Sequence, residues 1–204
     1  MTMGPACAGQ ILRAALAMGA DRAVHISDPA FAGSDTVSTA GILCAAVKAL
    51  PKQELILCGK KAIDSETGHV GPQLGLLLGV PVLTNVMSFS PAGGDGLELV
   101  CARDNAVLRL RAPFPVLLTV CNGTDMIRQP TIRGLRRAAE AELYCLDRQS
   151  LGLDAACVGL RGSGTETVAM TEQVFRQRRH EQTAELSRGV GYLLGQLLAE
   201  GGGA

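Results

Sequence analysis

The sequence predicts an α/β fold built on a doubly wound, mostly parallel sheet, and three observations support this prediction. Helical and strand-like patterns alternate from Pro5 to Pro81, as they do in successive βαβ units. The run Leu55–Cys58 is continuously apolar, which is typical of a parallel strand buried on both faces. Hydrophobic residues make up 47% of the 204 residues, which is enough for a substantial core.

The first half of the chain carries clear helix boundaries. A helix is expected between Pro5 and Gly19, with an apolar face formed by Ile11, Leu12, Ala15 and Leu16. A short strand over residues 23–26 and a turn-rich loop follow, and either Ser34 or Asp35 caps a helix that runs to about Leu50. After the strand 55–58, a helix through residues 73–78 ends at Gly79 and Pro81.

The second half begins with a predicted β-hairpin insertion. Strands over 82–89 and 97–102 are joined by the turn-forming run 91–96, and strands over 106–110 and 116–120 continue the sheet. A helix is expected over 133–141, and a last helix places leucines from Leu186 to Leu198 on one stripe. We therefore expect a nucleotide-binding α/β domain over residues 1–146 and a C-terminal arm, residues 147–204, that packs on a partner subunit.

Charge, composition and cysteine spacing exclude several classes of protein. The 19 basic and 19 acidic residues balance, and aromatic residues are 3%, which argues against nucleic-acid binding. Apolar runs stop short of the ~20 residues of a membrane span. The seven cysteines form no CxxC pair, so we expect reduced thiols without a metal, in a cytoplasmic chain. No Ser, His and Asp residues are spaced as a catalytic triad, so we predict no catalytic residue.

The loop from Gly59 to Pro72 is the best candidate for a binding site. In an open α/β sheet, ligands bind where strand ends lead into helix starts, whose free N–H groups attract anions. Gly68 and Gly71 permit a close approach of the backbone, and Thr67 and Asp64 offer polar contacts. The pattern is neither a P-loop nor a GxGxxG motif, so an ordinary capped connection explains the spacing equally well. The loops at Met3-Gly4 and at Phe31–Thr36 are expected at the same edge.

Four segments resemble the electron transfer flavoprotein beta subunit. They are LILCGKKAIDSETGHVGPQLGLLLGVP, TMGP, ALAMGADRAVHISD and FAGSDT, and the last is similar to the flavin-bifurcating branch of that family. The segment Gly159–Ser163 is similar to the family's GLxGSPT. The resemblance implies a Rossmann-like domain of the adenine nucleotide alpha-hydrolase type. It also implies that an N-terminal strand and helix of the family pattern are missing from the front of this domain.

The resemblance also implies cofactors, partners and site residues. The family pairs with an alpha subunit that holds a redox-active FAD, while the beta chain binds AMP or, in bifurcating members, a second FAD. By position, Met3 and Gly4 border the adenosine and residues 31–36 approach a second flavin. The resemblance implies that the phosphate and ribose are held by Ala62, Ile63, Asp64, Thr67, Gly68, His69, Val70 and Gly71. Cys58 and Gly59 are also expected among the cofactor-binding residues. The flavin loop comprises Phe31, Ala32, Gly33, Ser34, Asp35 and Thr36. Met126, Ile127 and Arg128 stand where the family has its partner-recognition loop.

Two functions remain open from the sequence. The resemblance implies an electron carrier between a dehydrogenase, such as an acyl-CoA dehydrogenase-like enzyme, and an acceptor. The alternative is a non-redox structural or regulatory subunit whose nucleotide site has degenerated. The absence of a P-loop disfavours an ATP-hydrolysing or adenylylating module.

Overall fold

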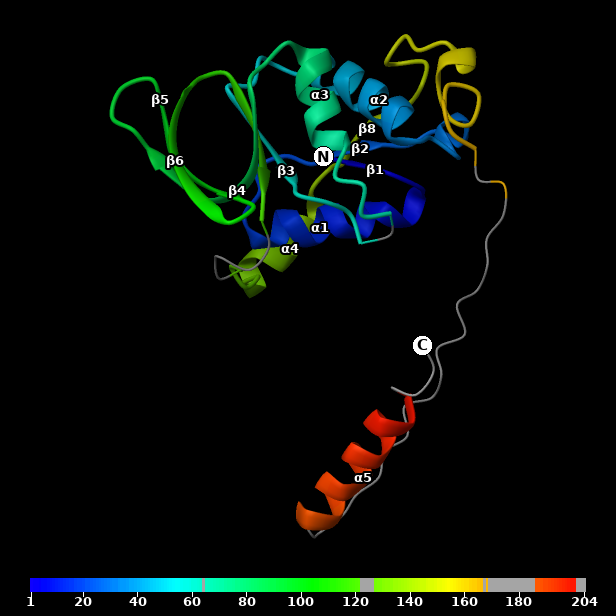
Figure 1. Ribbon diagram of the computed structural model, residues 1–204. Helices are drawn as coiled ribbons and strands as arrows, with labels where there is room; N and C mark the ends of the chain where they lie inside the picture. Colours follow the sequence, from blue (N-terminus) through cyan, green and yellow to red (C-terminus); the bar gives the residue numbers. More distant parts are fainter. Residues whose placement is uncertain (64, 122–126, 167, 169–185, 201–204) are drawn as a thin grey trace. The chain divides into compact units, whose positions relative to one another are not determined.

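The computed structural model describes residues 1–63, 65–121, 127–166, 168 and 186–200. The chain divides into two compact units, Met1–Glu166 and Thr167–Ala204, and each is described by itself. The first unit contains all the described strands and confirms the predicted α/β class (Figure 1). The second unit contains the helix α5 (Leu186–Glu200), where the sequence predicts the last helix. The proposed boundary at residue 146 stays a prediction.

The strands of the first unit form two sheets. A parallel three-stranded sheet has the order β1 (Thr2–Met3), β2 (Val24–Ile26) and β8 (Tyr144–Leu146). A five-stranded sheet has the order β3 (Leu55–Gly59), β7 (Val116–Val120), β4 (Val82–Pro91), β5 (Gly96–Arg103) and β6 (Ala106–Pro113). In this sheet β3, β7 and β4 are parallel, whereas β4, β5 and β6 are antiparallel, as the hairpin at residues 91–96 predicts.

Helices cover the strands from both sides. Helix α2 (Thr36–Ala49) lies beside α3 (Val70–Leu78), and α1 (Gly9–Met18) lies beside α4 (Ile132–Glu140) on the opposite side of the strands (Figure 1). Single 3₁₀ turns occur at η1 (Ala6–Ala8), η2 (Pro29–Phe31) and η3 (Ala155–Cys157). The predicted helix ends are confirmed, because Gly19 and Gly79 adopt left-handed φ values of 119° and 70°.

Two expectations about burial are wrong. The strand Leu55–Cys58 is not buried on both faces, since Leu57 is 51% exposed. The reason is that β3 is the edge strand of its sheet and pairs only with β7. Ile11 is 66% exposed, because α1 turns Leu12 and Leu16 inward against Ala138 of α4 and leaves Ile11 outside that contact.

The core consists of several apolar clusters that hold the strand ends in place. Ile26, Phe31 and Ile42 pack together between β2 and α2, and Leu146 and Val158 complete this cluster. Cys44 of α2 and Leu74 of α3 meet over Leu117 of β7. Contacts across α2 and α3 therefore connect the two sheets. Within the described residues, every helix falls short of the length and apolarity that a membrane span needs.

Candidate functional site

A pocket of about 270 Å³ lies where β3 and β7 end, at the loop that the sequence singles out. The loop contributes Lys60, Lys61, Glu66, Thr67 and Gly68 to its lining. The five-stranded sheet contributes Thr84, Asn85 and Thr119. Of the residues assigned to the nucleotide, the structure thus brings Thr67 and Gly68 into one cavity with the ends of two parallel strands.

The backbone of the loop is held by its own hydrogen bonds. The Lys60 N–H donates to the Val120 carbonyl at 3.0 Å, which joins the loop to the end of β7, and the Glu66 N–H donates to the Ala62 carbonyl at 3.0 Å. Gly68 has a φ of +65°, and a Cβ there would lie 3.2 Å from the Lys60 carbonyl oxygen. A larger residue at position 68 would therefore combine an unfavourable backbone conformation with a crowded contact.

Helix α3 begins at the pocket without a side-chain cap from the described residues. His69 occupies the N-cap position and makes no capping hydrogen bond, whereas Asp35 and Thr131 cap α2 and α4 with their side chains. No hydrogen bond of the described residues uses the N–H of Val70 or Gly71. Val70 and Gly71 do not line the pocket themselves, but they follow its lining residue Gly68 closely in the chain. N–H groups at the positive end of a helix that have no partner among the described residues suit an anionic ligand.

Six lining residues were not assigned to the site from the sequence. Lys60, Lys61 and Glu66 lie in the loop that the sequence singles out, whereas Thr84, Asn85 and Thr119 lie outside it. Asn85 has a φ of 56° and lies where the register of β4 against β7 shifts between Leu83 and Val86. One signal was available, since Thr119 is a polar residue near the carboxyl end of an otherwise apolar strand. The meeting of Thr119 with β4 was not predictable, because it depends on β7 entering the sheet beside β4.

The charges around the pocket favour an anion. Lys61 pairs with Glu66 at 2.8 Å, which leaves Lys60 as the lining cation that forms no ion pair with the described residues. Lys60 is exposed, so it can reach a ligand in the pocket without first breaking a contact. A lysine beside free helix N–H groups is a common arrangement for holding phosphate.

The other residues assigned to the nucleotide lie either on the exposed surface of the loop or at the end of β3. Ala62, Ile63 and His69 are exposed, with Ile63 exposed at 98%, and none lines the pocket. Cys58 and Gly59 end β3, and burial raises the pKa of the Cys58 thiol. Asp64 lies outside the described residues.

The Met3-Gly4 segment is fastened to β2 and does not line the pocket. The Gly4 N–H donates to the Ile26 carbonyl at 3.0 Å, and the Gly4 carbonyl lies 3.1 Å from His25 Nε2. The buried His25 ring therefore holds this turn by donating from Nε2. The predicted contact of Met3 and Gly4 with adenosine stays a prediction.

The Phe31–Thr36 loop is hydrogen-bonded to residues 159–165. This segment includes Gly159–Ser163, which is similar to the family's GLxGSPT. Asp35 caps α2 through the N–H groups of Val37 and Ser38 and also accepts from the Gly164 N–H at 2.8 Å. The Asp35 N–H donates in turn to Ser163 Oγ at 2.8 Å. Phe31 is buried in the core, while Ala32 and Gly33 are exposed. The contact of these residues with a second flavin stays a prediction.

The Asp35 carboxylate is stabilised as an anion by this arrangement. Hydrogen bonding from the Ser38 N–H holds the pKa of Asp35 below its usual value, despite the opposing effect of desolvation. The N–H groups of Gly164 and Val37 and the Thr165 hydroxyl act in the same direction. The loop and the segment 159–165 are thus joined through one charged side chain.

The residues assigned to partner recognition are only partly described. Ile127 and Arg128 are exposed, with Ile127 at 75%, and Met126 lies outside the described residues. An exposed isoleucine beside an arginine is compatible with a docking role, which stays a prediction.

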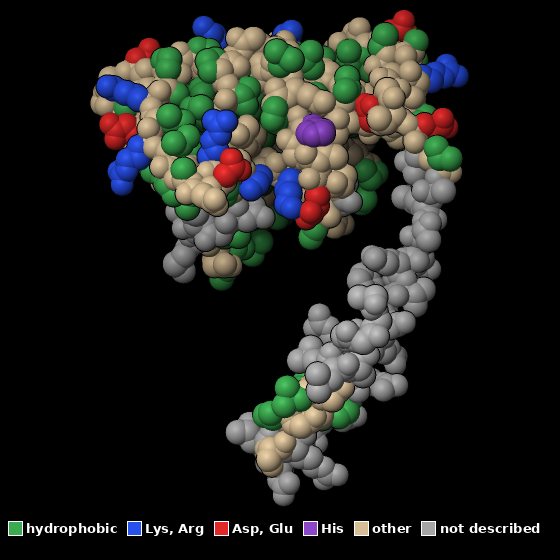
Figure 2. All heavy atoms as spheres, viewed as in Figure 1, with side chains coloured by type: hydrophobic (Ala, Val, Ile, Leu, Met, Phe, Trp, Pro, Cys, Tyr) green, Lys and Arg blue, Asp and Glu red, His purple; other side chains and the backbone are tan. Residues whose placement is uncertain are grey.

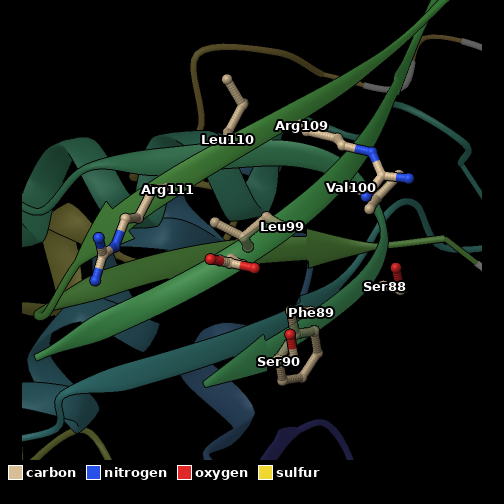
Figure 3. A pocket seen from close by; sticks show the side chains of 9 residues that line it. Ser88, Phe89, Ser90, Leu99, Val100, Arg109, Leu110 and Arg111 are labelled. Carbon is tan, nitrogen blue, oxygen red and sulfur yellow. The ribbon is translucent and has the colours of Figure 1, made fainter. Parts of the chain in front are cut away.

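A larger hollow of about 510 Å³ lies on the antiparallel part of the five-stranded sheet. Figure 3 shows Arg109 and Arg111 projecting from β6, with Leu110 pointing away from them. Arg111 donates to the carbonyls of Ala92 and Gly93 at 3.1 and 3.0 Å, so it stabilises the hairpin turn. The lining also contains the acidic residue Glu98. Basic and acidic side chains are likewise interspersed on the molecular face in Figure 2. This hollow therefore offers weaker support for an anion site than the pocket at Lys60.

Comparison with known proteins places this geometry in a family. Residues 1–143 match the family described as electron transfer flavoprotein domain. The chain is 38% identical over 172 residues to the electron transfer flavoprotein subunit beta of Megasphaera elsdenii, covering 81% of this chain and 63% of that protein. It is 35% identical over 192 residues to the protein FixA of Azotobacter vinelandii, covering 91% of this chain and 67% of that protein.

A third relative is the caffeyl-CoA reductase-Etf complex subunit CarD of Acetobacterium woodii. The identity is 35% over 176 residues, covering 86% of this chain and 64% of that protein. The chain thus spans slightly less than two thirds of the length of several relatives that it matches. The family match over residues 1–143 includes both the pocket at Lys60 and the loop at Asp35, and this chain belongs to the electron transfer flavoprotein beta-subunit family.

Proposed function

We propose that this chain binds an adenine nucleotide, AMP or FAD, at the pocket lined by Lys60, Thr67, Gly68 and Thr119. We propose further that it pairs with an FAD-containing alpha subunit and passes electrons between a dehydrogenase and an acceptor. The observation that carries the proposal is the pocket itself. It is formed at the ends of the parallel strands β3 and β7 by the loop whose sequence resembles that of the family. The flavin supplies the redox chemistry, and the chain's own residues bind and orient the nucleotide.

The lining residues suit the phosphate-bearing part of such a ligand. Lys60 supplies positive charge, Thr67 offers a hydroxyl, and Gly68 lets the backbone approach closely. The N–H groups of Val70 and Gly71, which form no hydrogen bond with other described residues, add donors at the start of α3. These donors can hold a phosphate group of either AMP or FAD, so the choice between the two nucleotides rests on what the alpha subunit and the loop at residues 31–36 contribute.

Exposed apolar side chains support pairing with other subunits. In α5, Val190 is 48% exposed, Leu193 62% and Leu194 54%. A helix that displays several large apolar side chains gains by covering them, and we propose that the alpha subunit does so. Because CarD is a subunit of a caffeyl-CoA reductase complex, a dehydrogenase of the acyl-CoA type is the partner that we propose. The seven free thiols suit a cytoplasmic location.

Co-expression with a candidate alpha subunit tests this proposal. The purified complex is denatured, and the released flavins and AMP are counted by absorbance and chromatography. Two flavins per heterodimer would support a bifurcating protein, and one flavin with one AMP would support a simple carrier. A stable chain that binds neither a nucleotide nor an alpha subunit would refute the proposal and favour a structural subunit with a degenerate site.

A further inference from the structure

Thr119 is a buried polar residue at the point where three parts of the pocket meet. Its exposure is 2%, and it lies near the carboxyl end of β7 among apolar neighbours. It also belongs to the lining of the pocket. A hydroxyl buried in such surroundings requires a hydrogen-bond partner, and the structure shows which backbone group provides it.

The hydroxyl of Thr119 holds one wall of the pocket. The Asn85 N–H donates to Thr119 Oγ1 at 3.2 Å. Asn85 lies at the irregularity of β4, with a φ of 56°, where the regular pairing with β7 is interrupted between Leu83 and Val86. Thr119 therefore satisfies an N–H that the sheet does not pair, and it fixes the residue pair Thr84 and Asn85 that faces the pocket.

The methyl group of Thr119 lies against the start of α3, the helix that follows the lining residues Thr67 and Gly68. A Cβ added at Gly71, the second residue of α3, would lie 2.6 Å from Thr119 Cγ2. The start of α3 therefore rests directly on this methyl group. One side chain contacts both the helix start with the free N–H groups and the irregular strand across from it.

We propose that Thr119 is a positioning residue for the anionic part of the ligand, holding Asn85 through its hydroxyl and the start of α3 through its methyl group. This inference rests on the proposed nucleotide site. Thr119 acts by fixing Asn85 relative to the start of α3, so its loss affects the phosphate more than the adenosine. The hydroxyl and the methyl group have separable effects.

The test compares Thr119→Val, which keeps the shape and removes the hydroxyl, with Thr119→Ser, which keeps the hydroxyl. Dissociation constants for AMP, FAD and adenosine are measured by calorimetry on the full chain, and hydrogen exchange is followed at the Asn85 amide. Thr39→Val in α2 is the matched control, since Thr39 does not line the pocket. Thermal unfolding of each variant separates loss of fold from loss of binding.

We expect Thr119→Val to weaken AMP binding about tenfold, the effect of one lost hydrogen bond, and to change adenosine binding less than about twofold. Faster exchange of the Asn85 amide should accompany this change. Thr119→Ser should bind AMP within about threefold of wild type, and Thr39→Val should match wild type. If wild type binds AMP and Thr119→Val binds it equally well, or if Thr119→Val weakens adenosine binding as much as AMP binding, the inference is wrong while the nucleotide site stands. If wild type binds neither AMP nor FAD, both fail.

Discussion

Replacing Gly71 with alanine should destabilise the protein, although the same change usually stabilises a helix. An alanine Cβ at this position would lie 2.6 Å from Thr119 Cγ2, whereas ordinary contact begins at 3.4 Å. The shortfall is 0.8 Å, the difference between these two distances. Thr119 is fully enclosed and β-branched, so its methyl group cannot turn aside at low cost. Either β7 or the start of α3 must move.

The magnitude follows from two opposing effects. Overpacking a core costs about 1–3 kcal/mol, and replacing glycine by alanine in a helix gains at most ~1 kcal/mol. Because Gly71 lies in the first turn, the gain is smaller than in a helix interior. We therefore expect Gly71→Ala to lower the free energy of unfolding by about 1–2 kcal/mol.

Urea unfolding at neutral pH, followed by circular dichroism, measures this change through the midpoint and slope of the transition. Gly41→Ala is the matched control: Gly41 lies inside α2, and a Cβ there would meet nothing within 4 Å. This control should stabilise the protein by about 0.5–1 kcal/mol. The two substitutions thus have opposite predicted signs for a physical reason visible in the structure.

A second substitution tests the cause directly. Thr119→Ser removes Cγ2, so in that background the next contact for an alanine at position 71 is Cys58 Cβ at 3.5 Å. The cost of Gly71→Ala should then fall to within about 0.5 kcal/mol of zero. If Gly71→Ala is as stabilising as Gly41→Ala, or if Thr119→Ser leaves its cost unchanged, the close packing of α3 on Thr119 is not the reason for the glycine.

Three further predictions concern other parts of the chain. Asp35→Ala should cost about 1 kcal/mol at pH 7 in urea unfolding, because it removes a helix cap. Since the folded pKa of Asp35 is lowered, the part of this stability that depends on its charge is present above the ordinary value of 3.8 and is lost as the pH falls through the lower folded pKa. A cost that does not shrink as the pH is lowered would contradict this. Cys58 should be alkylated by iodoacetamide at pH 8 more slowly than the exposed Cys7 and Cys145, because burial raises the pKa of the Cys58 thiol. The rates are measured by mass spectrometry, and equal rates would disprove this prediction. Gly159→Ala should lower the free energy of unfolding by about 2–4 kcal/mol, because a Cβ would clash with the Ala30 carbonyl oxygen at a φ of +61°. Gly152→Ala, which has a φ of +62° but open space, should cost only about 1–2 kcal/mol.

Local features of the fold could be predicted from the sequence because they depend on neighbouring residues. The Asp35 cap, the helix ends at Gly19 and Gly79 and the hairpin at 91–96 each follow from a few adjacent side chains. The exposure of β3 could not be predicted, because an apolar run does not reveal whether a strand lies at the edge of a sheet. The three-residue strand β8 was missed because it is too short to show a period.

The part of the site that lies in one continuous loop could be predicted from the sequence, whereas the part that distant strands contribute could not. The loop with Thr67 and Gly68 was identified from its place after a strand and before a helix. Thr84, Asn85 and Thr119 are separated from that loop in sequence, and β7 brings them to it only by entering the sheet between β3 and β4. Long-range pairing of this kind leaves little trace in a single sequence.

The most direct test of the nucleotide site is to count the adenine nucleotide released from the purified complex of this chain with an alpha subunit. Heat denaturation followed by chromatography and mass spectrometry identifies the compound and its stoichiometry. We expect one AMP or one FAD per beta chain, in addition to the FAD that we propose for the alpha subunit. Gly68→Val, which crowds the Lys60 carbonyl at a φ of +65°, should lose that nucleotide and keep the alpha-subunit FAD. Finding no nucleotide beyond the alpha-subunit FAD, or full retention in Gly68→Val, would contradict the assignment of the pocket.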